Sequence, residues 1–265
     1  MAKIQPIILA AGNGKRIIAE AMAKGMGELP KVLYPLQGRP LIDYVLDEVA
    51  AAAKLVQPDG IELLKPIVVV KFMQELVREH LGERVSYVEQ NPAPLGTGHA
   101  VLVTETAVPT EVDQVLVLNG DMPAWQPTTI AKVLRQAAHS KSTLTLATVD
   151  FTDPHFDTVF FAYGRIIRDS KDRLLKIVEQ RDTTEQELKI SECNPSLYCF
   201  DRSWVFAALH QLKNDNSQHE YYLTDLLGMA IEQGQAVETV PVADWREALG
   251  VNTLEQLQLT EKLLR

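Results

Sequence analysis

The alternation of short apolar segments with amphipathic ones most constrains how this chain can fold. In the first 150 residues, runs such as Ile4–Leu9 and Ile67–Val70 are apolar and β-branched, as in buried strands. Leu41–Leu55 instead places Val45 and Val49 on one face of a helix. Strands separated by helices in this way predict a mainly parallel sheet that is covered on both faces. The same reasoning predicts strands over 85–88, 114–118 and 143–149 and helices over 73–81, 97–106 and 127–138.

The pattern changes after about residue 150. The stretches 156–167, 173–178 and 194–200 are typical of antiparallel strands separated by polar turns. Helices are then expected over 203–212, 222–232 and 254–264, with a strand over 236–240. Neither a repeat nor a low-complexity linker interrupts the sequence. We therefore predict one α/β domain over 1–265, with an antiparallel insertion that forms a lid over one end of the sheet.

Composition narrows the class of protein. The chain has 265 residues, of which 46% are hydrophobic, and a net charge of −9, which argues against a broad nucleic-acid-binding face. It has neither a signal peptide at its start nor an apolar run of membrane-spanning length, so a cytoplasmic location without membrane association is expected. Cys193 and Cys199 lie in an apolar stretch and are expected to be reduced core residues.

A glycine-rich loop with basic residues follows the first strand. The segment Leu9-Ala10-Ala11-Gly12-Asn13-Gly14-Lys15-Arg16 combines small residues, which allow close approach to a ligand, with two cations. At the carboxyl end of the first parallel strand, this loop is placed to bind a nucleotide. The spacing fits neither a dinucleotide fingerprint nor a P-loop. A plain tight turn would use the same glycines.

The next segment supplies a second basic element. Leu29-Pro30-Lys31-Val32-Leu33 precedes Gly38-Arg39-Pro40-Leu41-Ile42, and together with the glycine-rich loop they resemble the sugar-1-phosphate nucleotidyltransferase superfamily. The resemblance implies a Rossmann-like, glycosyltransferase-A-like three-layer sandwich with a mixed, mainly parallel sheet and an antiparallel sugar-binding insertion. It also implies that Arg16 and Lys31 are catalytic residues that contact the triphosphate. The spacer over 17–28 is longer than the spacer of the family pattern. It is either a mobile flap hinged at Gly25 and Gly27 or a tolerated insertion.

A third motif, Leu95-Gly96-Thr97-Gly98-His99-Ala100, opens a predicted helix. Thr97 alone is a plausible helix cap, and the glycines suit a turn. The motif resembles the base-reading loop of the N-acetylglucosamine-1-phosphate uridylyltransferases, which implies that Gln90, Gly96, Thr97 and Gly98 read the base, with uracil favoured over thymine. Asn91-Pro92-Ala93-Pro94 departs from that pattern. His99 is interpreted as a packing residue rather than a general base.

Two further positions suit a divalent cation. Asp121 follows the apolar strand that ends at Gly120, and its carboxylate at a strand end fits a metal that bridges phosphates; an Asx-turn is the alternative. Asn252 lies in Leu249-Gly250-Val251-Asn252 and would otherwise belong to the cap region of the last helix. The resemblance makes Asp121 and Asn252 the ligands of Mg²⁺, the expected cofactor.

The sugar-binding residues are implied by the resemblance alone. Tyr163-Gly164-Arg165-Ile166, Val178-Glu179 and the stretch 192–194 follow the order of the family's sugar-binding elements. Pro195 and Ser196 replace the family's Thr-Gly, and a proline removes a backbone donor there. Taken singly, each residue has an ordinary structural explanation, such as helix packing. The predicted sugar-binding set is Gly164, Glu179, Asn194, Tyr222 and Thr224.

These motifs lead to one predicted activity. The chain resembles the uridylyltransferase domain of the bifunctional N-acetylglucosamine-1-phosphate uridylyltransferase/acetyltransferases, without their left-handed β-helix, so acetyl transfer is not expected. The expected reaction joins UTP to N-acetylglucosamine-1-phosphate with release of pyrophosphate. Residues 1–150 would bind the nucleotide, about 151–252 the sugar, and 253–265 would form a terminal helix. The alternatives are another base or phosphorylated alcohol (dTTP with glucose-1-phosphate, GTP with mannose-1-phosphate, or CTP) and a catalytically weak nucleotide-binding regulatory subunit. The oligomeric state is left open.

Overall fold

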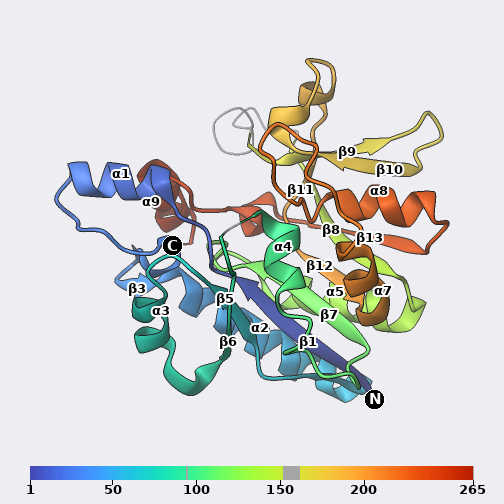
Figure 1. Ribbon diagram of the computed structural model, residues 1–265, viewed down its shortest axis with the longest axis horizontal. Helices are drawn as coiled ribbons and strands as arrows, with labels where there is room; N and C mark the ends of the chain where they lie inside the picture. Colours follow the sequence, from blue (N-terminus) through green and yellow to red (C-terminus); the bar gives the residue numbers. More distant parts are fainter. Residues whose placement is uncertain (94, 152–161, 265) are drawn as a thin grey trace.

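The protein is a layered α/β structure built on one mixed sheet (Figure 1). The computed structural model describes residues 1–93, 95–151 and 162–264. Within these ranges the sheet has eleven strands, and nine of them form the path β10-β9-β11-β8-β12-β7-β1-β5-β6. β4 pairs with β1 and β13 pairs with β8. The predicted fold class is confirmed.

The strands and helices follow the predicted alternation closely. The strands are β1 (Ala2–Leu9), β4 (Ile61–Leu63), β5 (Ile67–Val70), β6 (Ser86–Glu89), β7 (Gln114–Asn119), β8 (Leu144–Asp150), β9 (Gly164–Arg168), β10 (Leu174–Val178), β11 (Glu192–Asn194), β12 (Tyr198–Asp201) and β13 (Val237–Pro241), and β2 (Pro35–Leu36) and β3 (Arg39–Pro40) form a small separate hairpin. The helices are α1 (Lys15–Ala23), α2 (Leu41–Val56), α3 (Gln74–Leu81), α4 (Thr97–Leu102), α5 (Pro127–Ser140), α7 (Arg202–Leu209), α8 (Asp225–Glu232) and α9 (Leu254–Leu263).

The central strands bury both faces because their side chains alternate. Ile4 and Ile8 of β1 join the core beneath α2, α3 and α5, whereas Ile7 joins the core beneath α4, α7 and α8. β1 pairs in parallel with β5 and β7, so their carboxyl ends meet at one edge of the sheet. This edge carries the loops after β1 and β7. The buried reduced state predicted for Cys193 and Cys199 is confirmed.

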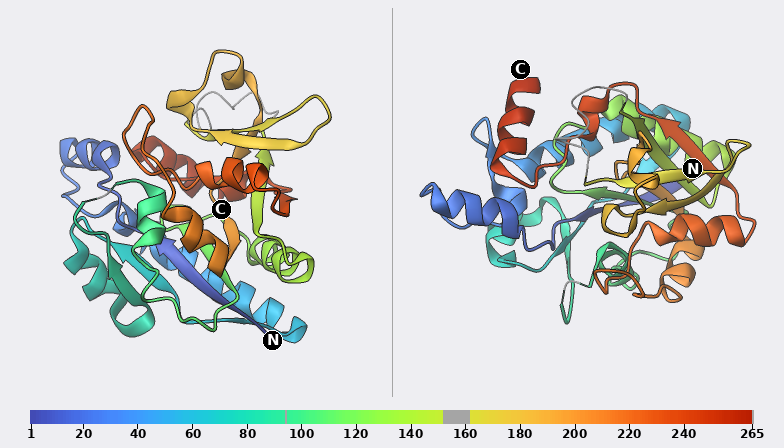
Figure 2. Two further views of the ribbon diagram at one scale, coloured as in Figure 1. Left: turned by 45° about the vertical axis from the view of Figure 1, so that its right-hand side comes forward. Right: turned by 90° about the horizontal axis from the view of Figure 1, so that it is seen from above.

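The antiparallel part is continuous with the main sheet, because β11 pairs with β8 and β9. β9, β10 and β11 thereby lie at one end of the sheet (Figure 2). The single strand predicted over 194–200 is two strands, because Pro195 and Ser196 turn the chain between β11 and β12. Ser196 has φ +59°, in the left-handed region that the family's glycine occupies readily. The predicted strand over 156–167 is observed only as β9, and its first part lies outside the described residues.

The long spacer after Arg16 forms most of helix α1 and the loop that follows it. Ile17 and Ala21 are buried against Val251 and Leu254, so α1 packs beside α9 (Figure 1). Glu20 accepts a hydrogen bond from the Leu254 amide at 2.7 Å. These contacts anchor α1 to the segment that carries Asn252. None of the helices in the described ranges is both long and apolar enough to cross a membrane.

Candidate active site

A cleft of about 630 Å³ opens at the carboxyl ends of β1 and β7. Its size lies within the usual range for small-molecule sites. Most of the predicted catalytic, nucleotide-binding, sugar-binding and metal-binding residues line it. These are Leu9, Ala10, Ala11, Gly12, Asn13, Gly14, Lys15, Lys31, Gln90, Gly96, Thr97, Asp121, Gly164, Glu179, Asn194 and Asn252.

Gly14 brings the glycine-rich loop against Lys31. It has φ +56°, and a Cβ placed on it would lie 2.9 Å from the Lys31 Cβ. Only glycine satisfies both the left-handed conformation and this close approach. The two basic elements, which are separate in the sequence, are therefore adjacent in space.

Lys31 is held between the two residues that were predicted to bind a metal. Its Nζ forms an ion pair with Asp121 and donates a hydrogen bond to the Asn252 Oδ1 at 3.0 Å. The side chains of Lys31 and Asp121 are 19% and 10% exposed, so the pair is only partly screened by water. The main chains are also joined, because the Val251 amide donates to the Asp121 carbonyl at 3.0 Å.

The oxygens of Asp121 and Asn252 have the donor chemistry that Mg²⁺ requires. A carboxylate and an amide carbonyl already converge on one positive charge, that of the Lys31 ammonium. Over residues 1–93, 95–151 and 162–264, no group of three or more His, Cys, Asp or Glu side chains converges. A metal here would therefore take two protein oxygens and complete its shell with phosphate and water, as Mg²⁺ commonly does.

The predicted base-reading loop is fastened to the segment before α8. Thr97 Oγ1 accepts a hydrogen bond from the Leu223 amide at 3.1 Å, and the Gly98 amide donates to the Tyr221 carbonyl at 2.8 Å. Gln90 is buried, and its Nε2 donates to the Gly96 carbonyl at 3.0 Å and to the ring of His99 at 3.1 Å. Burial lowers the pKa of His99, which keeps the imidazole neutral and able to accept this bond.

Among the residues predicted to bind the sugar, internal hydrogen bonds orient the polar side chains. Thr224 Oγ1 donates to the Glu179 carboxylate at 3.0 Å. Asn194 Nδ2 donates to the Tyr198 hydroxyl at 2.5 Å, and its Oδ1 accepts from the Ser196 amide at 3.1 Å. Burial raises the pKa of Glu179, while the bond from Thr224 partly offsets that rise.

The remaining predicted residues lie outside the cleft lining, as far as the structure describes it. Arg16 is exposed on the first turn of α1, where the neighbouring Ile17 turns into the core. Gly98 faces Leu212 and the Tyr221 main chain, and a Cβ on it would lie 2.6 Å from the Leu212 side chain. Tyr222 is buried, and its hydroxyl accepts a hydrogen bond from Gln218 Nε2 at 2.8 Å. Thr224 donates its hydrogen bond to the Glu179 carboxylate. Pro94 lies outside the described residues.

Several lining residues were not predicted to be in the site. They are Val32, Ala100, Asn119, Met122, Ala162, Tyr163, Arg181, Ser196, Gln218, Glu220 and Gly250. Asn119 and Gly250 stand beside motif residues, so their proximity was detectable. Arg181 and Gln218 reach the cleft from loops whose course the sequence pattern does not fix.

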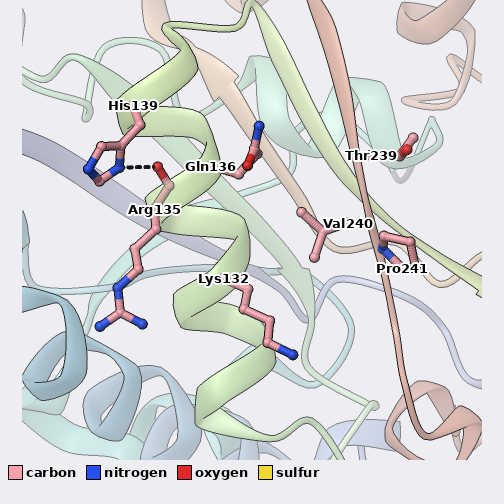
Figure 3. A pocket seen from close by; sticks show the side chains of 7 residues that line it. All are labelled: Lys132, Arg135, Gln136, His139, Thr239, Val240 and Pro241. Atoms are coloured by element: carbon pink, nitrogen blue, oxygen red, sulfur yellow. Dashed lines mark hydrogen bonds between the residues drawn. The ribbon is translucent and has the colours of Figure 1, made fainter.

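A second hollow, of about 410 Å³, lies between α5 and β13 and is shown in Figure 3. It is lined by Lys132, Arg135, Gln136, His139, Thr239, Val240 and Pro241. Arg135 is paired with Asp59 at 2.6 Å and donates to the Leu55 carbonyl at 2.7 Å. These bonds tie α5 to the end of α2.

Comparison with known proteins defines the class as that of the nucleotidyltransferases. The family model of the MobA-like NTP transferase domain matches residues 6–227, and the chain belongs to this family. The bifunctional protein GlmU of Heliobacterium modesticaldum is 37% identical over 265 residues, which are 100% of this chain and 53% of that protein. GlmU of Streptococcus agalactiae serotype V is 36% identical over 98% of this chain and 51% of its own length. The chain thus spans about half the length of the curated relatives it matches.

Solved structures agree with the fold. A structure of UDP-glucose pyrophosphorylase complexed with UDP-glucose has a TM-score of 0.72 at 18% identity and covers 100% of this chain and 98% of its own. A nucleotidyl transferase from Methanothermobacter thermautotroptrophicus has a TM-score of 0.63 at 18% identity and covers 99% of this chain and 98% of its own. The resemblance to the sugar-1-phosphate nucleotidyltransferases predicted from the sequence motifs is confirmed at the level of the family and the fold.

Proposed function

We propose that this chain transfers a uridylyl group from UTP to N-acetylglucosamine-1-phosphate in a Mg²⁺-dependent reaction. The observation that carries the proposal is the position of the Lys31 ammonium between Asp121 and Asn252, against the glycine-rich loop at Gly14. This arrangement combines a cation, two oxygen donors and a loop of small residues at one edge of a parallel sheet. Such a combination suits the triphosphate of a nucleotide.

The chemistry requires charge stabilisation rather than a side-chain nucleophile. An oxygen of the sugar phosphate forms a new bond to the α-phosphorus of UTP while the bond from that phosphorus to the bridging oxygen of pyrophosphate breaks. The attacking phosphate is already ionised, so the step needs no general base. Lys31 would stabilise the charge that develops on the leaving pyrophosphate, and the amides of Gly12 to Lys15 would orient the phosphates. Mg²⁺ held by Asp121 and Asn252 would offset the repulsion between the two phosphorylated reactants.

Arg16 receives a smaller role than Lys31 in this proposal. Lys31 lines the cleft, whereas Arg16 is exposed just beyond it, one residue after Lys15. A charge in water is screened and contributes less to the transition state than one in the cleft. Substitution of Arg16 is therefore expected to impair turnover less than substitution of Lys31.

The choice of base and sugar rests on the resemblance and on the relatives. Gln90, Gly96 and Thr97 line the cleft, and so do Gly164, Glu179 and Asn194. A protein of the same fold has been crystallised with UDP-glucose, a nucleotide sugar of the proposed product class. Another base, another sugar-1-phosphate, and a regulatory role are the competing outcomes. The need for nucleoside triphosphates makes a cytoplasmic location part of the proposal.

The test is a screen for pyrophosphate release from five nucleoside triphosphates against a panel of sugar-1-phosphates. We expect release with UTP and N-acetylglucosamine-1-phosphate, and loss of at least about a hundredfold in Asp121→Ala. Lys24→Ala, an exposed lysine at the end of α1, is the control that retains activity. Tight nucleotide binding without release from any pair would contradict catalysis and favour the regulatory alternative.

A further inference from the structure

The Tyr163 hydroxyl joins the sugar end of the cleft to the segment that carries Asn252. It donates to the Ala248 carbonyl at 2.7 Å and accepts from the Gly250 amide at 2.9 Å. Tyr163 immediately precedes Gly164, where β9 begins and pairs with Asn194 of β11. One phenol oxygen therefore bonds twice to the stretch between the short helix Trp245–Ala248 and α9.

Gly250 is shaped around this hydroxyl. A Cβ on Gly250 would lie 2.9 Å from the Tyr163 oxygen, closer than real Cβ atoms approach other atoms, and 3.8 Å from the Asn252 Nδ2. The absence of a side chain at Gly250 is thus what admits the phenol. The ring of Tyr163 stacks on the buried Phe151, with centroids 6.4 Å apart and planes 10° apart.

The opposite side of the same segment is fixed by the cation end of the cleft. The Val251 amide donates to the Asp121 carbonyl at 3.0 Å, and the Asn252 amide donates to Gln256 Oε1 at 2.7 Å. The segment is therefore hydrogen-bonded both to Asp121 and to Tyr163. The Asn252 Oδ1 in turn accepts a hydrogen bond from Lys31. Both Tyr163 and Gly250 also line the cleft.

We propose that Tyr163 is a positioning residue that fixes Asn252 as a cation ligand relative to the sugar-phosphate end of the cleft. The inference rests on the proposed function, since it takes Asn252 to hold the divalent cation. Groups that orient metal ligands through hydrogen bonds commonly change metal affinity by about 10- to 100-fold when they are removed. The Tyr163 hydroxyl would orient Asn252 in this way, because it forms two hydrogen bonds to the segment that carries Asn252.

The test uses Tyr163→Phe, which removes the hydroxyl and keeps the ring stacked on Phe151. Mn²⁺ is the probe, and its binding in the presence of UTP is followed by the electron paramagnetic resonance of free Mn²⁺. We expect the Mn²⁺ affinity to fall about tenfold, while UTP binding in EDTA stays within about twofold of the original protein. The matched control is Tyr44→Phe, which also loses one bond from a tyrosine hydroxyl to a carbonyl, that of Leu36 at 2.8 Å. This control should leave Mn²⁺ affinity unchanged.

A double-mutant cycle separates positioning from a general effect on stability. In an Asn252→Ala background, Tyr163→Phe should cause no further loss of Mn²⁺ affinity, because the ligand that it positions is gone. Additive losses, or unchanged Mn²⁺ affinity in Tyr163→Phe, would overturn the role of Tyr163. Equal Mn²⁺ affinity in Asn252→Ala and the original protein would instead overturn the proposed cation site, and with it the inference. The binding assay gives these answers whether or not a sugar substrate has been found.

Discussion

Replacement of Lys31 by alanine is predicted to change activity and metal binding in opposite directions. In the proposed reaction Lys31 would supply the charge that contacts the triphosphate, so its loss should reduce turnover at least about a hundredfold, within the ~3–4 kcal/mol that one well-placed donor can contribute. Its ammonium also neutralises Asp121 in the nucleotide-free protein. Removal leaves that carboxylate and the Asn252 oxygen free for a divalent cation. Binding of Mn²⁺ without nucleotide should therefore become tighter.

The size of the gain follows from the geometry. A unit charge and a divalent cation about 4 Å apart repel each other by ~8 kcal/mol at the effective dielectric near a protein surface. The Lys31 ammonium can move away on its flexible side chain when a metal binds. Lys31→Ala therefore relieves only part of the repulsion between the ammonium and the metal. We expect a gain of at least ~1.4 kcal/mol, which is a tenfold lower Kd.

The assay is titration calorimetry with Mn²⁺ alone, beside pyrophosphate release with both substrates. Lys24→Ala is the matched control, because it removes an exposed lysine at the end of α1. Lys31→Ala that binds Mn²⁺ no more tightly than the original protein would refute competition between ammonium and metal. Turnover near that of the original protein would refute the catalytic role of Lys31.

Two further predictions concern the sugar side and the base-reading loop. Glu179 has a raised pKa, so its contribution to stability is fully present below its unfolded pKa and is lost as pH rises through the folded pKa. Glu179→Gln, which can keep the bond from Thr224, should therefore raise Tm increasingly toward pH 8 and weaken sugar-1-phosphate binding; an equal Tm change at pH 4 and pH 8 would contradict this. Gly96 has φ +100°, and a Cβ on it would lie 2.6 Å from the Tyr221 carbonyl oxygen, so Gly96→Ala should cost at least about 2 kcal/mol, or roughly 4–8 °C in Tm by calorimetry. Gly60→Ala has a positive φ but open space, and should cost clearly less; equal losses would show that the contact with Tyr221 is unimportant.

The strands of the sheet were predictable because the sequence of each strand by itself shows that the strand is buried. Ile67–Val70 is apolar and β-branched throughout, and β5 has these bounds. Leu41 begins both the predicted and the observed helix α2, since the apolar spacing starts there and Pro40 precedes it. Local patterns of this kind depend directly on burial, so the elements that they predict are found in the folded structure.

The course of the 17–28 spacer was not predictable from a family pattern whose spacer is shorter. Its apolar positions, Ile17 and Ala21, find their partners in Val251 and Leu254, more than 200 residues away. Likewise, the predicted strand over 194–200 ignored the turn at Pro195. Such long-range contacts and turns depend on the tertiary context.

The candidate site was predictable where motif residues stand at strand ends. Asp121 and Lys31 were expected to act on the same phosphates, and the structure brings them into contact. Arg16 was predicted to be catalytic from its position in the family motif, and in the structure it is exposed on helix α1. The support by Tyr163 was hidden, because it bonds to the main chain of Gly250 and Ala248. Main-chain partners leave little trace in sequence.

The proposed joining of a nucleoside triphosphate to a sugar phosphate can be followed by ³¹P nuclear magnetic resonance of UTP, N-acetylglucosamine-1-phosphate and Mg²⁺ with the protein. We expect growth of the paired diphosphate signals of a UDP-sugar together with pyrophosphate in equal amounts, and their absence with Asp121→Ala. Hydrolysis of UTP without a UDP-sugar, or equal product formation by Asp121→Ala, would contradict it.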